Sequence, residues 1–233
     1  MWRRDKNNWK HSAPILFPII GPLKNNQYNF EGMVYSLGQH GFARNSMFEV
    51  VELEKNHVVL RLSSNKKTLE MYPFHFCLNV TFSLINSSLK VSYQVINNGD
   101  NNLYFQIGGH PAFACPLYSY ESYNDYYIEF EREEEIIIKI MDKEKRGMSH
   151  VEEKFFDLEK RFFVRQALFE RNAIIFQNCK SSYVSLKSIN HNKEVRVHFK
   201  DYPYLGVWAG KRAGGLLTIE PWHGHGDYID FFG

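Results

Sequence analysis

Three short segments of the chain combine an ionisable side chain with glycine or proline, and they hold the residues best suited to acid and base chemistry. They are Gln39–Arg44, Gly108–Phe113 and Ile219–Gly224. Glycine and proline restrict how the local backbone can run, so a side chain beside them is presented in a defined direction. In the second segment His110 follows two glycines, and in the third Glu220 stands between an apolar run and a proline.

His110 and Glu220 together are candidates for proton transfer. An imidazole and a carboxyl group that face one substrate form an acid and base pair, because one can release a proton while the other accepts one. Taken separately, each has a structural interpretation: the histidine as a hydrogen-bonding residue of a turn, and the glutamate as the partner of a nearby cation. The catalytic hypothesis requires that the two distant segments meet in the fold.

Two other groups could bind ligands. Residues 223–227 read His-Gly-His-Gly-Asp, three potential ligands of a divalent metal. Glycine-rich turns after a strand also collect His and Asp for hydrogen bonding, and we expect no metal here. Arg44 carries a planar guanidinium that suits a sugar hydroxyl or a phosphate group, or a purely structural ion pair.

The elements that must position these side chains are β-strands. Runs rich in β-branched and aromatic residues recur along the chain and are separated by turn sequences such as Asn-Asn-Gly-Asp at 97–100. In Phe74–Leu84 every second residue is apolar, which is typical of an antiparallel strand with one buried face. Only Lys154–Arg171 favours short helical turns. The pattern predicts an all-β fold, a sandwich of antiparallel strands with a few short helical turns.

Composition narrows the classes of function. The chain has 233 residues, 44% hydrophobic and 23% charged, as in a folded globular protein. A formal net charge of +2 is too small for binding a phosphate backbone, so we expect no nucleic-acid partner. We find neither an apolar leader nor an apolar run of membrane-spanning length, and expect a cytoplasmic protein with no membrane contact. The three cysteines are odd in number and widely spaced, which favours free, buried thiols.

Four ordered motifs carry a resemblance to a known family. In chain order they are Ala13–Gly21, His40–Arg44, Gly109–Phe113 and Glu220–Trp222. Together they resemble the aldose 1-epimerase, or mutarotase, family, and within it the branch associated with bacterial lactose operons. The resemblance extends from Trp2 to about Tyr228. It implies a galactose mutarotase-like β-supersandwich with a sugar-binding cleft, and an isomerase of carbohydrate metabolism that needs no cofactor and acts on a small sugar.

The resemblance also implies roles for single residues. Glu220 matches the family's general base, which removes the proton of the anomeric hydroxyl, and His110 matches its general acid, which protonates the ring oxygen. Ring opening and reclosure would interconvert the α and β anomers of an aldohexose. His40 matches a second histidine that holds the sugar. We expect Trp222 to stack on a sugar face and Trp208 to lie in the core.

Two positions depart from the family's pattern. Pro22 stands where the family usually has an arginine, and Asn172 stands where it generally has an aspartate that binds sugar hydroxyls. Proline offers neither a cation nor a backbone N–H, and an amide makes weaker hydrogen bonds than a carboxylate. Three interpretations stay open: a mutarotase of free aldohexoses, a hexose 6-phosphate 1-epimerase that uses basic residues near Arg44, and a sugar-binding protein with weak catalysis.

The length of the chain is short for this resemblance. The tryptophan that Trp2 matches lies after several strands in the family, so residues 1–233 are expected to form a single domain that lacks the family's opening strands. Missing strands would leave a sheet edge or an apolar face uncovered. We therefore expect lowered stability or self-association through an uncovered edge and, at the extreme, a product that folds poorly.

Overall fold

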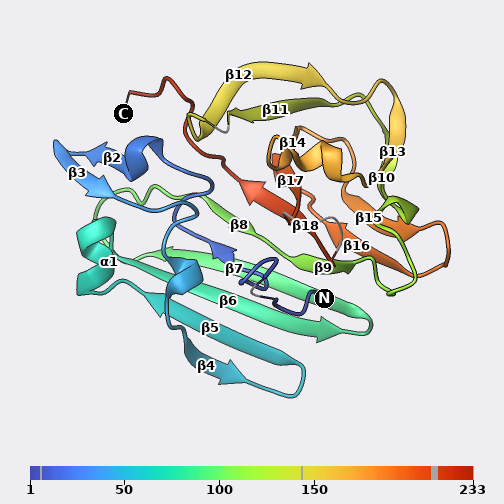
Figure 1. Ribbon diagram of the computed structural model, residues 1–233. Helices are drawn as coiled ribbons and strands as arrows, with labels where there is room; N and C mark the ends of the chain where they lie inside the picture. Colours follow the sequence, from blue (N-terminus) through green and yellow to red (C-terminus); the bar gives the residue numbers. More distant parts are fainter. Residues whose placement is uncertain (6, 143, 211–214, 233) are drawn as a thin grey trace.

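Antiparallel β-sheets form most of the molecule, as the sequence predicts. The computed structural model describes residues 1–5, 7–142, 144–210 and 215–232. Within these residues eighteen strands form four sheets, and all pairings between the strands are antiparallel (Figure 1). No described helix is both long and apolar enough to cross a membrane.

The largest sheet has eight strands and forms the centre of the fold. Its order is β1-β8-β18-β17-β14-β11-β12, and β9 also pairs with β18. Strands from both ends of the chain therefore meet at β18. The strands are β1 (Ile15–Leu16), β8 (Ile107–Gly109), β9 (Ala112–Cys115), β11 (Ile137–Asp142), β12 (Gly147–Lys154), β14 (Ile174–Gln177), β17 (Tyr204–Ala209) and β18 (Gly215–His223).

A second sheet, in the order β13-β10-β15-β16, packs on one face of the large sheet. Phe130 and Leu186 from this sheet share one apolar core with Phe176 and Leu217 from the large sheet. The pair of sheets is a sandwich of the kind that alternating strands predict. Its strands are β10 (Tyr126–Glu134), β13 (Glu159–Phe163), β15 (Tyr183–Ser188) and β16 (Glu194–His198).

A third sheet, in the order β4-β5-β6-β7, lies along the bottom of the view in Figure 1. Phe76 and Leu78 of β6 pack in a separate core with Phe17 and Phe42. A hairpin of β2 and β3 completes the strands. The bounds are β2 (Gln27–Phe30), β3 (Met33–Ser36), β4 (Glu49–Leu53), β5 (His57–Ser63), β6 (Phe76–Ile85) and β7 (Ser88–Asn97).

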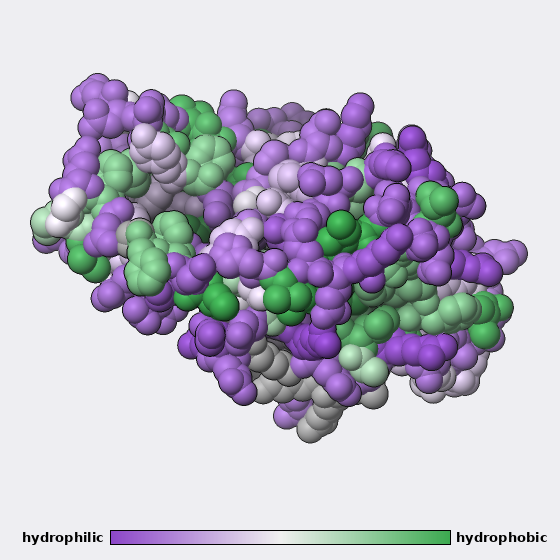
Figure 2. Space-filling view, turned by 90° about the horizontal axis from the view of Figure 1, so that it is seen from above, coloured by the Kyte–Doolittle hydropathy of each residue, from purple (hydrophilic) through white to green (hydrophobic). Residues whose placement is uncertain are grey.

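The inner face of this third sheet is apolar along its whole length but is only partly covered. Strand pairing aligns Leu53, Val58, Phe82 and Val91 in one row across it. Toward the two hairpin turns this face is open, and Leu53 is 75% exposed. The opposite side of the molecule, seen in Figure 2, is mainly hydrophilic with separate hydrophobic patches. Part of this apolar face is thus uncovered among the described residues.

Helical segments are few and short in the described residues, and the sequence analysis predicted only some of them. The one α-helix among the described residues, α1 (Lys66–Met71), begins at an Asn65 capping box, a signal that the sequence analysis missed. Helical turns expected over Lys154–Arg171 are limited to one 3-10 turn, because part of that range is strand β13. The 3-10 turns are η1 (Lys24–Asn26), η2 (Ala43–Asn45), η3 (Tyr123–Asp125) and η4 (Gln166–Phe169).

The cysteines are all free, as the sequence predicts. Cys77 and Cys115 are buried, whereas Cys179 is only partly buried and therefore departs from the expected burial.

Candidate active site

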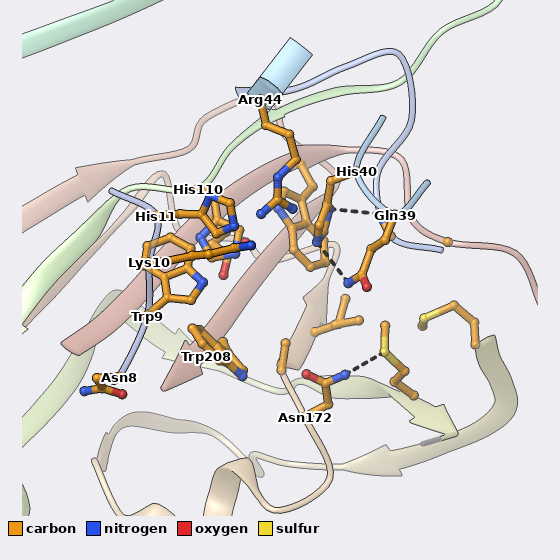
Figure 3. A pocket seen from close by; sticks show the side chains of 18 residues that line it. Asn8, Trp9, Lys10, His11, Gln39, His40, Arg44, His110, Asn172 and Trp208 are labelled. Atoms are coloured by element: carbon orange, nitrogen blue, oxygen red, sulfur yellow. Dashed lines mark hydrogen bonds and ion pairs between the residues drawn. The ribbon is translucent and has the colours of Figure 1, made fainter. Parts of the chain in front are cut away.

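Strand alternation divides the side chains of the large sheet between a core and a cavity. On β18, Leu217 and Ile219 enter the apolar core, whereas Thr218, Glu220 and Trp222 point to the opposite face, since successive side chains alternate. A cavity of about 420 Å³ lies over that opposite face (Figure 3). All six residues that the sequence singled out line it: His40, Arg44, His110, Asn172, Glu220 and Trp222.

His110 and Glu220 meet because their strands are paired. β8 ends one residue before His110, and β8 pairs with β18 so that Gly108 lies opposite Trp222. The pairing brings His110 Nε2 to 3.1 Å from Glu220 Oε2. Both residues are buried, with 9% and 1% of their surface exposed. An imidazole and a carboxyl group therefore face each other directly in the cavity wall.

Burial determines the protonation of Glu220. Loss of solvent raises the pKa of this carboxyl group to about 8, although a hydrogen bond with Thr218 opposes the shift. The Thr218 hydroxyl lies 2.6 Å from Glu220 Oε1 and 3.1 Å from the carbonyl oxygen of Trp208. One hydroxyl proton cannot serve both oxygens, and a carbonyl can only accept. A protonated Glu220 resolves the conflict by supplying the proton of its own contact.

His110 is neutral at ordinary pH. Burial lowers the pKa of its imidazole well below the usual range, and the nearby His40, Arg44 and His11 lower it further. With a protonated Glu220 beside a neutral His110, the pair holds one titratable proton in addition to the N–H of the neutral imidazole. Because the two groups are in contact, that proton can lie on either one, and the pair titrates as a unit.

His40 is fixed by two backbone hydrogen bonds to one residue. Its N–H donates to the Gly21 carbonyl oxygen at 3.0 Å, and its Nδ1 accepts from the Gly21 N–H at 3.1 Å. The residue has a left-handed backbone (φ 67°), as does Gly41 (φ 69°), where a Cβ would lie 2.3 Å from the Phe17 oxygen. Burial lowers the pKa of His40 to about 3. The ring is thus neutral, with the proton on Nε2.

Arg44 supplies a positive charge to the cavity. It comes from η2, and within the described residues its guanidinium forms no ion pair with a carboxylate. A second cavity of about 650 Å³ adjoins the first and shares Arg44 and Lys10 with it. Lys67 also lines the second cavity, and none of the described residues lining it is an aspartate or glutamate. This side of the site is therefore electropositive.

The tryptophans are arranged differently from the expectation. Trp222 is 4% exposed, and its indole lies against Gly206, where a Cβ would approach it to 2.8 Å. Trp208, expected in the core, is only half-buried and lines the cavity, since it shares the face of β17 that Gly206 and Tyr204 occupy. The expectation for Trp208 was wrong because the alternation along β17 directs this side chain to the cavity face and not to the core.

Three aromatic or basic residues of the N-terminal segment were missed, as was Asn8 beside them. Trp9, Lys10 and His11 line the cavity, and Figure 3 shows their side chains gathered beside His110. The sequence gives little local signal for them, because they belong to no strand and to none of the motifs quoted above. Their only shared feature is that each is aromatic or basic.

The two departures from the family's pattern lie in different surroundings. Asn172 lines the cavity in a left-handed conformation (φ 94°), and its Nδ2 lies 3.0 Å from the sulfur of Met141. Pro22 is buried outside the cavity lining and packs against Gly226, where a Cβ would lie 2.8 Å from the proline ring.

The His-Gly-His-Gly-Asp segment has other contacts. The ring of His223 packs on an aromatic side chain, and Nδ1 of His225 bonds to the carbonyl oxygen of the next residue. Asp227 accepts a hydrogen bond from the backbone N–H of Lys24 at 2.9 Å. Among the described residues, no three potential ligands cluster as a metal site.

Comparisons with known proteins agree with this fold. The sequence model of the aldose 1-epimerase family matches residues 1–233. The chromosomal LacX protein of Lactococcus lactis is 33% identical over 232 residues, which cover 96% of this chain and 77% of LacX. A galactose mutarotase related enzyme of Lactobacillus acidophilus superposes with a TM-score of 0.93 at 32% identity, over 100% of this chain and 78% of that one. A galactose mutarotase-like protein of Lactobacillus casei gives 0.89 at 29% identity, over 97% and 78%.

The antiparallel sandwich is therefore of the galactose mutarotase-like kind. The chain belongs to the aldose 1-epimerase family, a class of sugar isomerases.

Proposed function

We propose that the protein interconverts the α and β anomers of an aldohexose by acid–base ring opening. The observation that carries the proposal is the 3.1 Å contact between His110 Nε2 and Glu220 Oε2 in the cavity wall. The anomeric carbon bears two oxygens, and the ring opens when a base takes the proton of one and an acid gives a proton to the other. Family membership supports the same class of reaction.

In the proposed step Glu220, as the carboxylate, removes the proton of the anomeric hydroxyl group. The electron pair of that O–H bond forms the carbonyl bond, and the bond from C1 to the ring oxygen breaks. His110, as the imidazolium, gives its proton to the ring oxygen. Transfer of the pair's titratable proton from Glu220 to His110 creates the reactive state, and ring opening returns the pair to its resting protonation. Rotation about the C1–C2 bond and reversal of these steps close the other anomer.

The remaining cavity residues suit a sugar ligand. The neutral His40 can donate from Nε2 to a sugar oxygen, and Asn172 offers an amide to a hydroxyl group. Trp208 presents aromatic surface for the apolar face of a pyranose, while the more buried Trp222 forms the floor.

Saturation-transfer NMR of anomer exchange tests the proposal with glucose, galactose and their 6-phosphates. We expect Glu220→Gln to reduce the exchange rate on the order of 10²-fold or more. The matched control is Glu49→Gln, an exposed glutamate on β4 outside the cavity. Exchange by the wild type no faster than in buffer for all four sugars would refute the proposal. Binding by calorimetry without acceleration would instead support a sugar-binding protein.

A phosphorylated aldohexose is the second candidate substrate. The specific observation that favours it is the electropositive second cavity, where Arg44, Lys10 and Lys67 are not balanced by any lining carboxylate. A phosphate on the sugar could bind the guanidinium there while C1 stays beside His110.

The two substrates are distinguished by Arg44→Gln. For a hexose 6-phosphate we expect KM to rise on the order of tenfold or more, since a charge-assisted hydrogen bond is lost. For the free hexose KM should change less than twofold. The control is Arg61→Gln, whose side chain bonds to Asn79 on the third sheet. Equal effects on both sugars would argue against a phosphate site at Arg44.

A further inference from the structure

The indole of Trp9 lies flat against the imidazole of His110. The ring centroids are 4.9 Å apart and the planes differ by 21°, which is a stacked arrangement. Trp208 and His40 contact the same imidazole edge-on, at 6.2 and 5.9 Å. Of the described aromatic rings, Trp9 alone stacks flat on the histidine.

Hydrogen bonds do not fully fix the orientation of this imidazole. Nε2 lies 3.1 Å from Glu220, whereas Nδ1 is buried and forms no hydrogen bond to another described residue. The orientation of a functional histidine is commonly set by the hydrogen bond of its second nitrogen. The ring interacts with the backbone of His110 itself, but no other described residue holds Nδ1, so packing must fix the remaining freedom about the Cβ–Cγ bond.

The segment that carries Trp9 is anchored next to His110. The Trp9 N–H donates to the Asp5 carbonyl oxygen at 2.7 Å, which closes a tight turn. The Trp2 N–H donates to the carbonyl oxygen of Ala112, two residues after His110, at 2.9 Å. Trp9 also contacts Trp208, with centroids 5.9 Å apart. The indole is therefore held in place by contacts that do not involve the histidine.

We propose that Trp9 is the positioning residue of His110, and that its stacked indole keeps Nε2 directed toward Glu220 and the substrate. The kinetic consequence rests on the proposed function, because it concerns proton transfer by His110. The orientation of the imidazole does not, and it can be measured in the protein without substrate.

Three variants separate stacking from general packing. Trp9→Leu removes the flat ring and keeps an apolar side chain, whereas Trp9→Phe keeps a ring that can stack. Trp2→Leu makes the same change in the same segment, at a ring that does not stack on His110 within the described contacts. If Trp9→Leu does not fold cooperatively, Trp9→Met takes its place in the comparison.

The first measurement is proton–nitrogen correlation NMR of the His110 ring through a pH titration. In Trp9→Leu we expect the ring-proton shifts to move, because the ring current of the indole is lost. The pKa of His110 should rise toward its ordinary value as water reaches the ring. The charged and titratable groups that face it, Glu220, His40, Arg44 and His11, are the same in every variant.

The second measurement is the rate of anomer exchange. Trp9→Leu should lower kcat on the order of 10- to 100-fold, the effect expected from a misplaced catalytic group. We expect KM to change less than about threefold, Trp9→Phe to retain most of kcat, and Trp2→Leu to match the wild type.

Three results would overturn the proposal. The first is a Trp9→Leu protein with unchanged His110 resonances and unchanged kcat. The second is a rise in KM alone, which would make Trp9 a sugar-binding wall. The third is a Trp9→Phe protein as impaired as Trp9→Leu. Failure of the proposed function is recognised separately, because Glu220→Gln would then leave the exchange rate unchanged while the NMR measurement still reports on the stack.

Discussion

At the scale of single residues, burial affects the pKa values of Glu220 and His110 more than neighbouring charges do. Desolvation is the largest cause of the raised pKa at Glu220 and of the lowered pKa at His110. Both pKa shifts oppose an ionised pair. Without substrate the pair therefore consists of a protonated carboxyl group and a neutral imidazole. In the proposed reaction this proton would have to move in either direction, because the two anomers interconvert.

The pH dependence of kcat/KM follows from this shared proton. The rate is expected to be flat near neutral pH and to fall as the pH rises through about 8, because the pair then loses its titratable proton. The measurement is anomer exchange in a series of buffers on both sides of pH 8. A rate that instead increases through this range would show that only the ionised Glu220 matters and that His110 is not the acid.

Asn172→Asp should tighten the binding of a free hexose. Asp tolerates a left-handed backbone, and a carboxylate accepts stronger hydrogen bonds from sugar hydroxyls than an amide does. We expect KM to fall about fivefold, from a gain of roughly 1 kcal/mol. Asn178→Asp, at another left-handed but exposed asparagine outside the cavity, is the control. An unchanged KM would show that the position does not contact the sugar.

Among the elements, paired strands bring the candidate acid and base together. The alternation in Phe74–Leu84 and the turn sequences were sufficient to predict antiparallel strands. They were not sufficient to predict which strands pair, because the pairing of β8 with β18 joins segments far apart in the chain. The grouping of His110 with Glu220 could therefore be proposed only through a resemblance. Trp9 escaped prediction because a residue outside any strand has no periodic pattern.

At Gly206, strand β17 packs closely against the Trp222 indole of β18. It lies opposite Glu220 in the pairing of β17 with β18, and an added Cβ would meet the Trp222 indole at 2.8 Å. We expect Gly206→Ala to lower the free energy of unfolding by about 1–3 kcal/mol through overpacking. Gly38→Ala, where a Cβ would meet nothing within 4 Å, is the control. Denaturant unfolding followed by fluorescence makes the comparison, and equal stabilities would contradict this account of Gly206.

At the scale of the whole molecule, the third sheet has an apolar face that is uncovered at one end. The apolar row across β4 to β7 carries no charged side chain, because Glu52 and Lys90 project from the other face. The outer edges of β4 and β7 have no strand partner among the described residues. We propose that a second copy of the chain covers this face, since an identical apolar sheet can pack on it face to face.

Self-association is tested by light scattering with size exclusion over a concentration series. We expect wild-type dimers or larger species, and a shift toward monomer in a variant that combines Leu53→Lys with Leu89→Lys. Ile85→Lys is the matched control, because Ile85 is 51% exposed at the end of β6 and its side chain points to the opposite face. A wild type that stays monomeric at all concentrations would refute the proposal.

The position of β18 between β8 and β17 has a consequence for synthesis on the ribosome. All other described strands precede β18 in the chain, yet it is the strand that joins the early part of the large sheet to the later part. A nascent chain that has not released β18 exposes two unpaired sheet edges and carries His110 without its glutamate. The pairing of His110 with Glu220 would then arise only after β18 has been translated, when completion of the central sheet and assembly of the candidate site become a single event.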